Sequence, residues 1–241
     1  MIEPIKIGYH WILDALFPRR CLGCKKFGTY CCAACLGTLE FSRQLHCPAC
    51  GLTNPLGEFC EDCLADKNLN GLWVTLSYGN PLVREMIRQL KFSGLTELVE
   101  PLGNLLIATL KTFNLPPAWH SIPKENWFLT PVPLHSRRER DRNFNQATLL
   151  AQKISGATGL AISPTLKRSQ STLPQSNIKD DEERKNNIKN AFELIADTNV
   201  VGRAYILIDD VYTSGSTLEA CAKVLKQNGA SETWGLVVAK G

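Results

Sequence analysis

The chain has 241 residues, of which 44% are hydrophobic and 21% are charged, and its formal net charge is +4 at pH 7. It contains no repeat or low-complexity segment, and no stretch is apolar enough and long enough to span a membrane. The modest positive charge permits a phosphorylated ligand or a nucleic acid but requires neither of them. The length exceeds one average domain without requiring two large ones.

The first twenty residues carry Asp14 and end in Pro18-Arg19-Arg20, with no continuous apolar core and no small-residue cleavage site. This composition argues against an export signal, so we expect a cytoplasmic protein. The apolar residues over 12–17 predict a short amphipathic helix that packs on the segment that follows.

Nine of the ten cysteines lie between Cys21 and Cys63. Eight of these form four Cys-x-x-Cys turns: Cys21 and Cys24, Cys32 and Cys35, Cys47 and Cys50, and Cys60 and Cys63. Each turn directs two thiolates at a tetrahedral ion and two turns close a structural zinc site, so the spacing predicts one or two zinc ions. Pairing of the first turn with the second and of the third with the fourth is simplest. Crossed pairing and a single occupied site stay open.

A disulfide framework, which needs an oxidising compartment, and an iron–sulfur cluster are the alternatives to zinc. Cys31 falls outside the four turns, and Cys221 is expected to be a small buried hydrophobic side chain. Up to about residue 65 the chain holds too little apolar sequence for a core, so metal must supply the stability. The polar segment 65–71 is typical of a linker. We therefore predict a Cys-rich module over 1–65 and a larger domain over 72–241.

Apolar periodicities alternate along the larger part as they do in an α/β domain. Strands are predicted at 73–78, 127–132, 205–208 and 233–239, and helices at 81–92, 98–110, 145–156 and 217–227. The predicted fold class is α/β, a parallel sheet flanked by helices and preceded by a small Cys-rich zinc-ribbon module.

Two polar segments of the larger part suit an anionic ligand. Four arginines follow the strand that ends at residue 132: Arg137, Arg138, Arg140 and Arg142. Their guanidinium groups suit pyrophosphate or another anion, and a solvated charged loop is the alternative. The polar stretch 167–190, with Arg168, Gln175, Arg184 and Asn187, is long for a compact domain. It indicates a cover that keeps water away from a reactive ligand.

The segment 205–217 carries the strongest indication of chemistry. Four apolar residues form a short buried strand that ends at Asp209 and Asp210, and a hydroxyl-rich turn leads into the last helix. At such a junction the N–H groups of the helix start suit phosphate, and Gly215 allows a close approach. The two carboxylates would repel phosphate but suit sugar hydroxyls or magnesium, so a phosphorylated sugar is the predicted ligand. An ordinary turn with Ser or Thr as N-cap is the alternative.

This segment resembles the 5-phosphoribosyl-1-pyrophosphate (PRPP) signature of type I phosphoribosyltransferases. The resemblance implies that Asp209 and Asp210 hold the ribose hydroxyls in the catalytic site. It also implies that the following loop binds the 5-phosphate through Thr213, Ser214, Gly215, Ser216 and Thr217.

The chain as a whole is similar to the ComF family of competence proteins. The similarity covers the cysteine module, Leu90-Lys91-Phe92-Ser93-Gly94, Pro131-Val132-Pro133-Leu134, Arg142-Asn143-Phe144-Asn145-Gln146, the set Gln175, Arg184 and Asn187, and the segment 205–217. The family usually has glycine where this chain has Asn143, and asparagine tolerates left-handed backbone better than most residues. The resemblance implies a phosphoribosyltransferase-like fold that binds PRPP with Mg²⁺. It implies pyrophosphate ligands among Lys91, Arg137, Arg138 and Arg140.

Three functions follow from these features. The first is transfer of ribose 5-phosphate from PRPP to an unknown acceptor. The second is a competence accessory for DNA uptake, in which the zinc module and the arginines at 137–142 bind single-stranded DNA or a helicase partner. The third is a regulator that binds PRPP or a related phosphosugar as a signal without turning it over.

Overall fold

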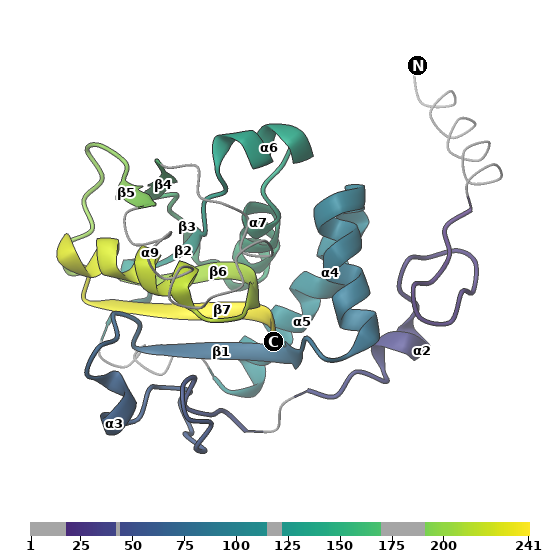
Figure 1. Ribbon diagram of the computed structural model, residues 1–241, viewed down its shortest axis with the longest axis horizontal. Coiled ribbons are helices and arrows are strands. Elements are labelled where there is room, and N and C mark those ends of the chain that lie inside the picture. The colour runs from purple at the N-terminus through teal and green to yellow at the C-terminus, as the bar shows by residue number, and fades with distance from the viewer. Residues whose placement is uncertain (1–17, 42–43, 115–121, 170–190) are drawn as a thin grey trace.

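The computed structural model describes residues 18–41, 44–114, 122–169 and 191–241 (Figure 1). The helix predicted at 12–17 and most of the predicted cover at 167–190 lie outside the described residues. The helices are α2 (Ala33–Leu36), α3 (Glu61–Leu64), α4 (Pro81–Ser93), α5 (Val99–Thr112), α6 (Ser136–Arg142), α7 (Gln146–Thr158) and α9 (Ser216–Gln227). The strands are β1 (Gly71–Ser77), β2 (Trp127–Pro131), β3 (Ala161–Ile162), β4 (Leu166–Arg168), β5 (Phe192–Leu194), β6 (Ala204–Tyr212) and β7 (Glu232–Lys240).

Five strands form one sheet in the order β1-β7-β6-β2-β3, and every neighbouring pair is parallel. The predicted end of the β6 strand at residue 208 is wrong. The backbone pairing with β7 continues past the apolar run, with Asp209 opposite Val237 and Tyr212 opposite Lys240. Both carboxylates therefore sit inside a paired strand, where successive side chains point to opposite faces of the sheet.

Helices cover both faces of this sheet, and each face has its own core. On one face, α4, α5 and α7 pack against Ile206 and Ile208 of β6. On the other face, α9 and β5 pack against Tyr205 and Leu207 of the same strand. The predicted fold class, a parallel sheet flanked by helices and preceded by a Cys-rich module, is confirmed.

Helix α4 shows how local sequence sets these elements. Its buried residues, Val83, Met86, Ile87 and Leu90, recur at helical spacing. The side chain of Asn80 accepts hydrogen bonds from the backbone N–H groups of Leu82 and Val83, and Pro81 occupies the first turn. Gly94 ends the helix in the left-handed conformation, with φ 66°. The helix predicted at 81–92 is therefore confirmed to within one residue.

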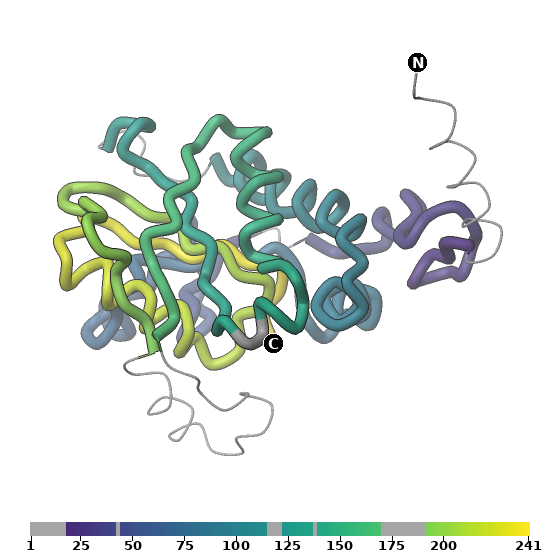
Figure 2. Tube along the Cα trace, turned by 90° about the horizontal axis from the view of Figure 1, so that it is seen from above, coloured from purple at the N-terminus to yellow at the C-terminus, as the bar shows by residue number. Residues whose placement is uncertain are grey.

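The cysteine module joins the sheet at the β1 edge. The backbone N–H of Leu72 donates to the carbonyl of Gly57 at 2.9 Å, and the indole of Trp73 donates to the carbonyl of Leu56 at 3.0 Å. These bonds attach the second pair of cysteine turns to β1. The first pair, with α2, lies at one end of the molecule and packs against the α4 side of the core (Figure 2). The division into 1–65 and 72–241 stays our proposal.

None of the helices among the described residues combines the length and the apolar character needed to cross a bilayer.

Candidate functional site

Two sets of four cysteines converge within the module. The sulfurs of each set lie within 4.8 Å of one another: Cys21, Cys24, Cys32 and Cys35 in the first, and Cys47, Cys50, Cys60 and Cys63 in the second. The Sγ atoms of Cys21 and Cys32 are 3.7 Å apart, as are those of Cys50 and Cys60. Tetrahedral zinc with bonds of about 2.3 Å requires sulfurs about 3.8 Å apart, whereas a disulfide requires about 2.05 Å. The sets fit two zinc ions, and the sequential pairing is confirmed.

The two zinc sites repeat one backbone design. The N–H of Cys32 donates to the Sγ of Cys21 at 3.4 Å, and the N–H of Cys60 donates to the Sγ of Cys47 at 3.5 Å. Such bonds stabilise a thiolate ligand. Lys25, with φ 66°, holds the left-handed position that Gly51 holds in the second site with φ 78°. Glycine is the usual residue in this conformation, whereas lysine at the same position gives no sign of a left-handed turn in the sequence.

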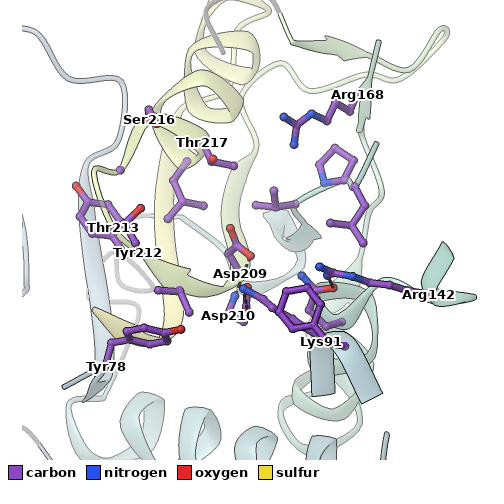
Figure 3. Close-up of a pocket in the computed structure, with 18 of the residues that line it drawn as sticks. Tyr78, Lys91, Arg142, Arg168, Asp209, Asp210, Tyr212, Thr213, Ser216 and Thr217 are labelled. Carbon is purple, nitrogen blue, oxygen red and sulfur yellow. Dashed lines mark hydrogen bonds and ion pairs between the residues drawn. The ribbon is translucent and has the colours of Figure 1, made fainter. Parts of the chain in front are cut away.

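A cavity of about 760 Å³ lies at the carboxyl end of β6 (Figure 3). It brings together the acids of β6, the start of α9, the last turn of α4, the end of α6 and the end of β4. Sequence-predicted residues that line it are Lys91, Asp209, Asp210, Thr213, Gly215, Ser216 and Thr217. Ligands of open parallel sheets bind at this edge, so the position of the cavity agrees with the predicted one.

The two adjacent acids differ in environment. Asp210 is only 2% exposed, and its carboxylate forms an ion pair with the ammonium of Lys91 at 2.5 Å. Burial opposes ionisation of Asp210, but the charge of Lys91 and the hydrogen bonds of the carboxylate together outweigh it, and the pKa of Asp210 lies below its ordinary value. Burial and the charge of Asp210 together raise the pKa of Asp209 well above its ordinary value. The carboxylate of Asp209 also accepts the N–H of Asp210 at 2.8 Å.

The loop before α9 has a sharp turn at Gly215. This glycine is the N-cap of α9, with φ 77°, and the ring of Tyr212 lies against the position that a Cβ would occupy. The hydroxyls of Ser214 and Ser216 lie 3.0 Å apart, and Ser214 is the one loop residue of the predicted set that does not line the cavity. The turn exposes backbone N–H groups and hydroxyls at the cavity wall, a surface that suits phosphate.

The arginine segment is a short helix, α6, and not a loop, although its residues Glu139, Arg140 and Asp141 are exposed to solvent as the alternative interpretation expected. Its last residue, Arg142, lines the cavity, donates to the side chain of Gln146 at 3.0 Å and lies over the ring of Phe92. Arg140 is exposed and does not line the cavity, and the side chains of Arg137 and Arg138 lie outside the described residues.

Three cavity residues were not assigned to the ligand from sequence: Tyr78, Phe92 and Arg168, the last of which was named only as part of the predicted cover. Arg142 belongs to the arginine segment that was predicted to suit an anion, and it lies at the end of α6, one turn before α7 begins. Asn143 has φ 61°, which confirms the left-handed turn expected at that position. Its neighbour Asn145 caps α7 and donates to the carbonyl of Val132 at 3.0 Å, which fixes this turn beside the end of β2.

The fold and the site define a class of protein: a tandem zinc-binding module joined to an α/β domain with a polar cavity at the edge of its parallel sheet. Residues 12–64 match the family described as a double zinc ribbon domain. DNA utilization protein YhgH of Salmonella typhi is 33% identical over 208 residues, covering 83% of this chain and 86% of that protein. Competence protein F of Haemophilus influenzae is 27% identical and covers 87% of this chain and 97% of that protein. Competence protein ComFC of Bacillus subtilis is also 27% identical and covers 82% of this chain and 78% of that protein.

The chain therefore belongs to the ComF family, as its sequence motifs predicted. Among solved structures, a hypoxanthine phosphoribosyltransferase of Staphylococcus aureus is 13% identical, with a TM-score of 0.35 over 59% of this chain and 64% of that one. This overlap is too small to bear on function, which has to be argued from the cavity.

Proposed function

We propose that this protein binds PRPP at the carboxyl end of β6 and transfers ribose 5-phosphate from it to an acceptor. The observation that supports this proposal is the meeting of three kinds of group in one cavity. These are the carboxylate of Asp209, the hydroxyl-rich start of α9, and the arginines at the ends of α6 and β4. PRPP has a matching part for each of them: ribose hydroxyls, a 5-phosphate and a pyrophosphate.

Each part of the cavity has a proposed role. The loop at Thr213, Ser214, Gly215, Ser216 and Thr217 takes the 5-phosphate at the positive end of the α9 dipole. Asp209 accepts hydrogen bonds from the ribose hydroxyls. Arg142 and Arg168, which line the cavity, take the pyrophosphate through charge-assisted hydrogen bonds. Arg137 and Arg138 lie on the same helix as Arg142 and stay candidates for the same anion, whereas Arg140 is exposed.

The proposed reaction breaks the bond between C1 of the ribose and the pyrophosphate oxygen, and forms a bond from C1 to the acceptor. Positive charge develops on the ribose ring while negative charge develops on the leaving pyrophosphate. Asp209 faces the first charge and the two arginines face the second, so each stabilises the transition state more than the ground state. Mg²⁺ bound with PRPP would neutralise more of the leaving-group charge, and Asp209 is the carboxylate that would hold it.

Calorimetric titration of magnesium-PRPP into the zinc-loaded protein tests this proposal. We expect binding by the wild-type protein and a loss of at least about tenfold in affinity for Asp209→Asn, because one hydrogen bond to a charged group is removed. Asp66→Asn is the matched control, since Asp66 is exposed and lies away from the cavity. A wild-type protein that does not bind, or an Asp209→Asn variant with unchanged affinity, would refute the assignment. Pyrophosphate release with candidate acceptors then separates transfer from the alternative of a PRPP-binding regulator.

The first zinc ribbon favours a second function, binding of single-stranded DNA as a competence accessory. Residues 18–41 carry Arg19, Arg20, Lys25 and Lys26 against a single carboxylate, Glu40. Phe27 is 58% exposed, and the guanidinium of Arg20 lies 4.3 Å from the centroid of its ring. Cations beside an exposed aromatic ring suit single strands. Fluorescence anisotropy with labelled oligo-dT tests this function: Lys25→Gln with Lys26→Gln should weaken binding and flatten its salt dependence. Unchanged affinity would exclude this ribbon as the binding surface.

A further inference from the structure

The pleat of β6 separates the two acids of the signature. Ile206 and Ile208 pack in the core on the α4, α5 and α7 side, and Tyr205 and Leu207 pack on the α9 side. Because side chains alternate along a strand, Asp210 lies on the same face as Ile206 and Ile208. Asp209 lies on the α9 side with Tyr205 and Leu207. Figure 3 agrees: Asp209 points toward Thr217 and the loop, while Asp210 points toward Lys91. The acids are therefore not equivalent.

Lys91 is held in place for a contact with Asp210. It lies in the last turn of α4, whose Val83, Met86, Ile87 and Leu90 are at most 1% exposed. The Lys91 side chain is 23% exposed and that of Asp210 is 3% exposed. Burial lowers the pKa of a lysine, but the charges of Asp210 and Asp209 outweigh it, and the pKa of Lys91 lies above its ordinary value. Both partners are thus charged and fixed on rigid elements.

We propose that Lys91 is a positioning residue for the sugar site rather than a pyrophosphate ligand. Its ammonium acts as a fixed counter-ion that holds Asp210 ionised inside the protein. It occupies the position that a divalent cation would take beside Asp210. Asp209 is then the acid that meets the ligand, held in place by its bond from the N–H of Asp210. This inference rests on the proposed function for the identity of the ligand.

The two roles of Lys91 predict different losses of affinity. Ribose 5-phosphate has the sugar hydroxyls and the 5-phosphate but no pyrophosphate, and inorganic pyrophosphate has only the anion. We expect Lys91→Met to lower the affinity for ribose 5-phosphate by at least about tenfold and to leave the affinity for pyrophosphate unchanged. Lys91→Arg, which keeps the charge, should recover part of the loss. Arg142→Met is the matched control, because Arg142 lines the same cavity, and it should show the opposite selectivity.

The measurement is calorimetry of the zinc-loaded full chain with each of the two ligands. A Lys91→Met variant that loses affinity for pyrophosphate and keeps its affinity for ribose 5-phosphate would overturn the inference. If Lys91→Met does not fold, Asp210→Asn carries the same test, because it removes the ion pair with a side chain of the same shape. Unchanged ribose 5-phosphate affinity in Asp210→Asn would also overturn it.

Manganese binding tests the counter-ion role without any sugar ligand. Removal of the ammonium leaves the carboxylate of Asp210 without its counter-ion, and a carboxylate oxygen suits a hard divalent cation at the position that the ammonium held. By electron paramagnetic resonance, Lys91→Met should bind one Mn²⁺ more per chain than the wild type, and Lys91→Met with Asp210→Asn should lose it again. No additional Mn²⁺ in Lys91→Met overturns the inference. A wild-type protein that binds neither sugar ligand nor PRPP instead refutes the proposed function, so the two failures are distinguishable.

Discussion

Substitution of Gly215 by alanine should destabilise the protein through two separate effects. The residue has φ 77°, and left-handed backbone costs a residue with a Cβ about 1–2 kcal/mol. The new Cβ would also overlap the ring of Tyr212, which is only 8% exposed and has little room to move. Overpacking of this kind costs about 1–3 kcal/mol. The expected loss in the free energy of unfolding is therefore about 2–5 kcal/mol.

Gly202 provides a matched control for the backbone effect alone. It has φ 70°, and no heavy atom lies within 4 Å of the position that its Cβ would take. Gly202→Ala should therefore cost only about 1–2 kcal/mol. Urea unfolding of both variants, followed by circular dichroism at equal zinc content, gives the two losses, and their difference isolates the overlap with Tyr212. Equal losses would show that the ring moves aside freely and would refute this account of the loop.

Three further predictions concern the metal sites, the acid pair and the attachment of the module. Elemental analysis should find two zinc ions per chain, falling to one in Cys21→Ser and in Cys47→Ser but not in Cys31→Ser, since Cys31 belongs to neither set. In urea unfolding at neutral pH, Asp209→Asn should be more stable than wild type. The raised pKa of Asp209 means that ionisation destabilises the folded state, so the gain should shrink as the pH falls toward the ordinary carboxyl range, and a constant gain would contradict this. Asp210→Asn should instead lose about 3–5 kcal/mol, because it leaves the ammonium of Lys91 without its partner. Trp73→Phe removes the hydrogen bond to Leu56 and should cost about 1–3 kcal/mol by the same assay, with an unchanged midpoint as the contrary result.

The features that could be predicted from sequence are those set by neighbours along the chain. Asn80, Pro81 and Gly94 mark the ends of α4, and the burial of its apolar stripe follows from helical spacing. The zinc sites were predictable for the same reason, because each Cys-x-x-Cys turn contains half of a ligand set. Their pairing needed the structure, since spacing alone allows more than one combination.

The elements that were missed lack an apolar pattern that could be recognised along the chain. The short strands β4 and β5 stabilise each other as an antiparallel pair, and neither has an apolar run long enough to be recognised alone. Helix α6 is almost entirely charged, so no apolar stripe marks it. The position of Arg168 in the cavity could not be predicted, because this residue lies at the end of β4 and that strand depends on its pairing with β5.

The acid pair shows most directly what the sequence left undetermined. Two adjacent aspartates after an apolar run were interpreted as the end of a strand, where both would face the ligand. The strand instead continues because β7 keeps pairing with it, and the pleat then sends the carboxylates to opposite faces. One face holds the start of α9 and the other holds Lys91, so identical side chains become a ligand-facing acid and an internal ion pair. The same substitution at the two positions should therefore change stability with opposite sign, a difference that follows from strand pairing and not from residue type.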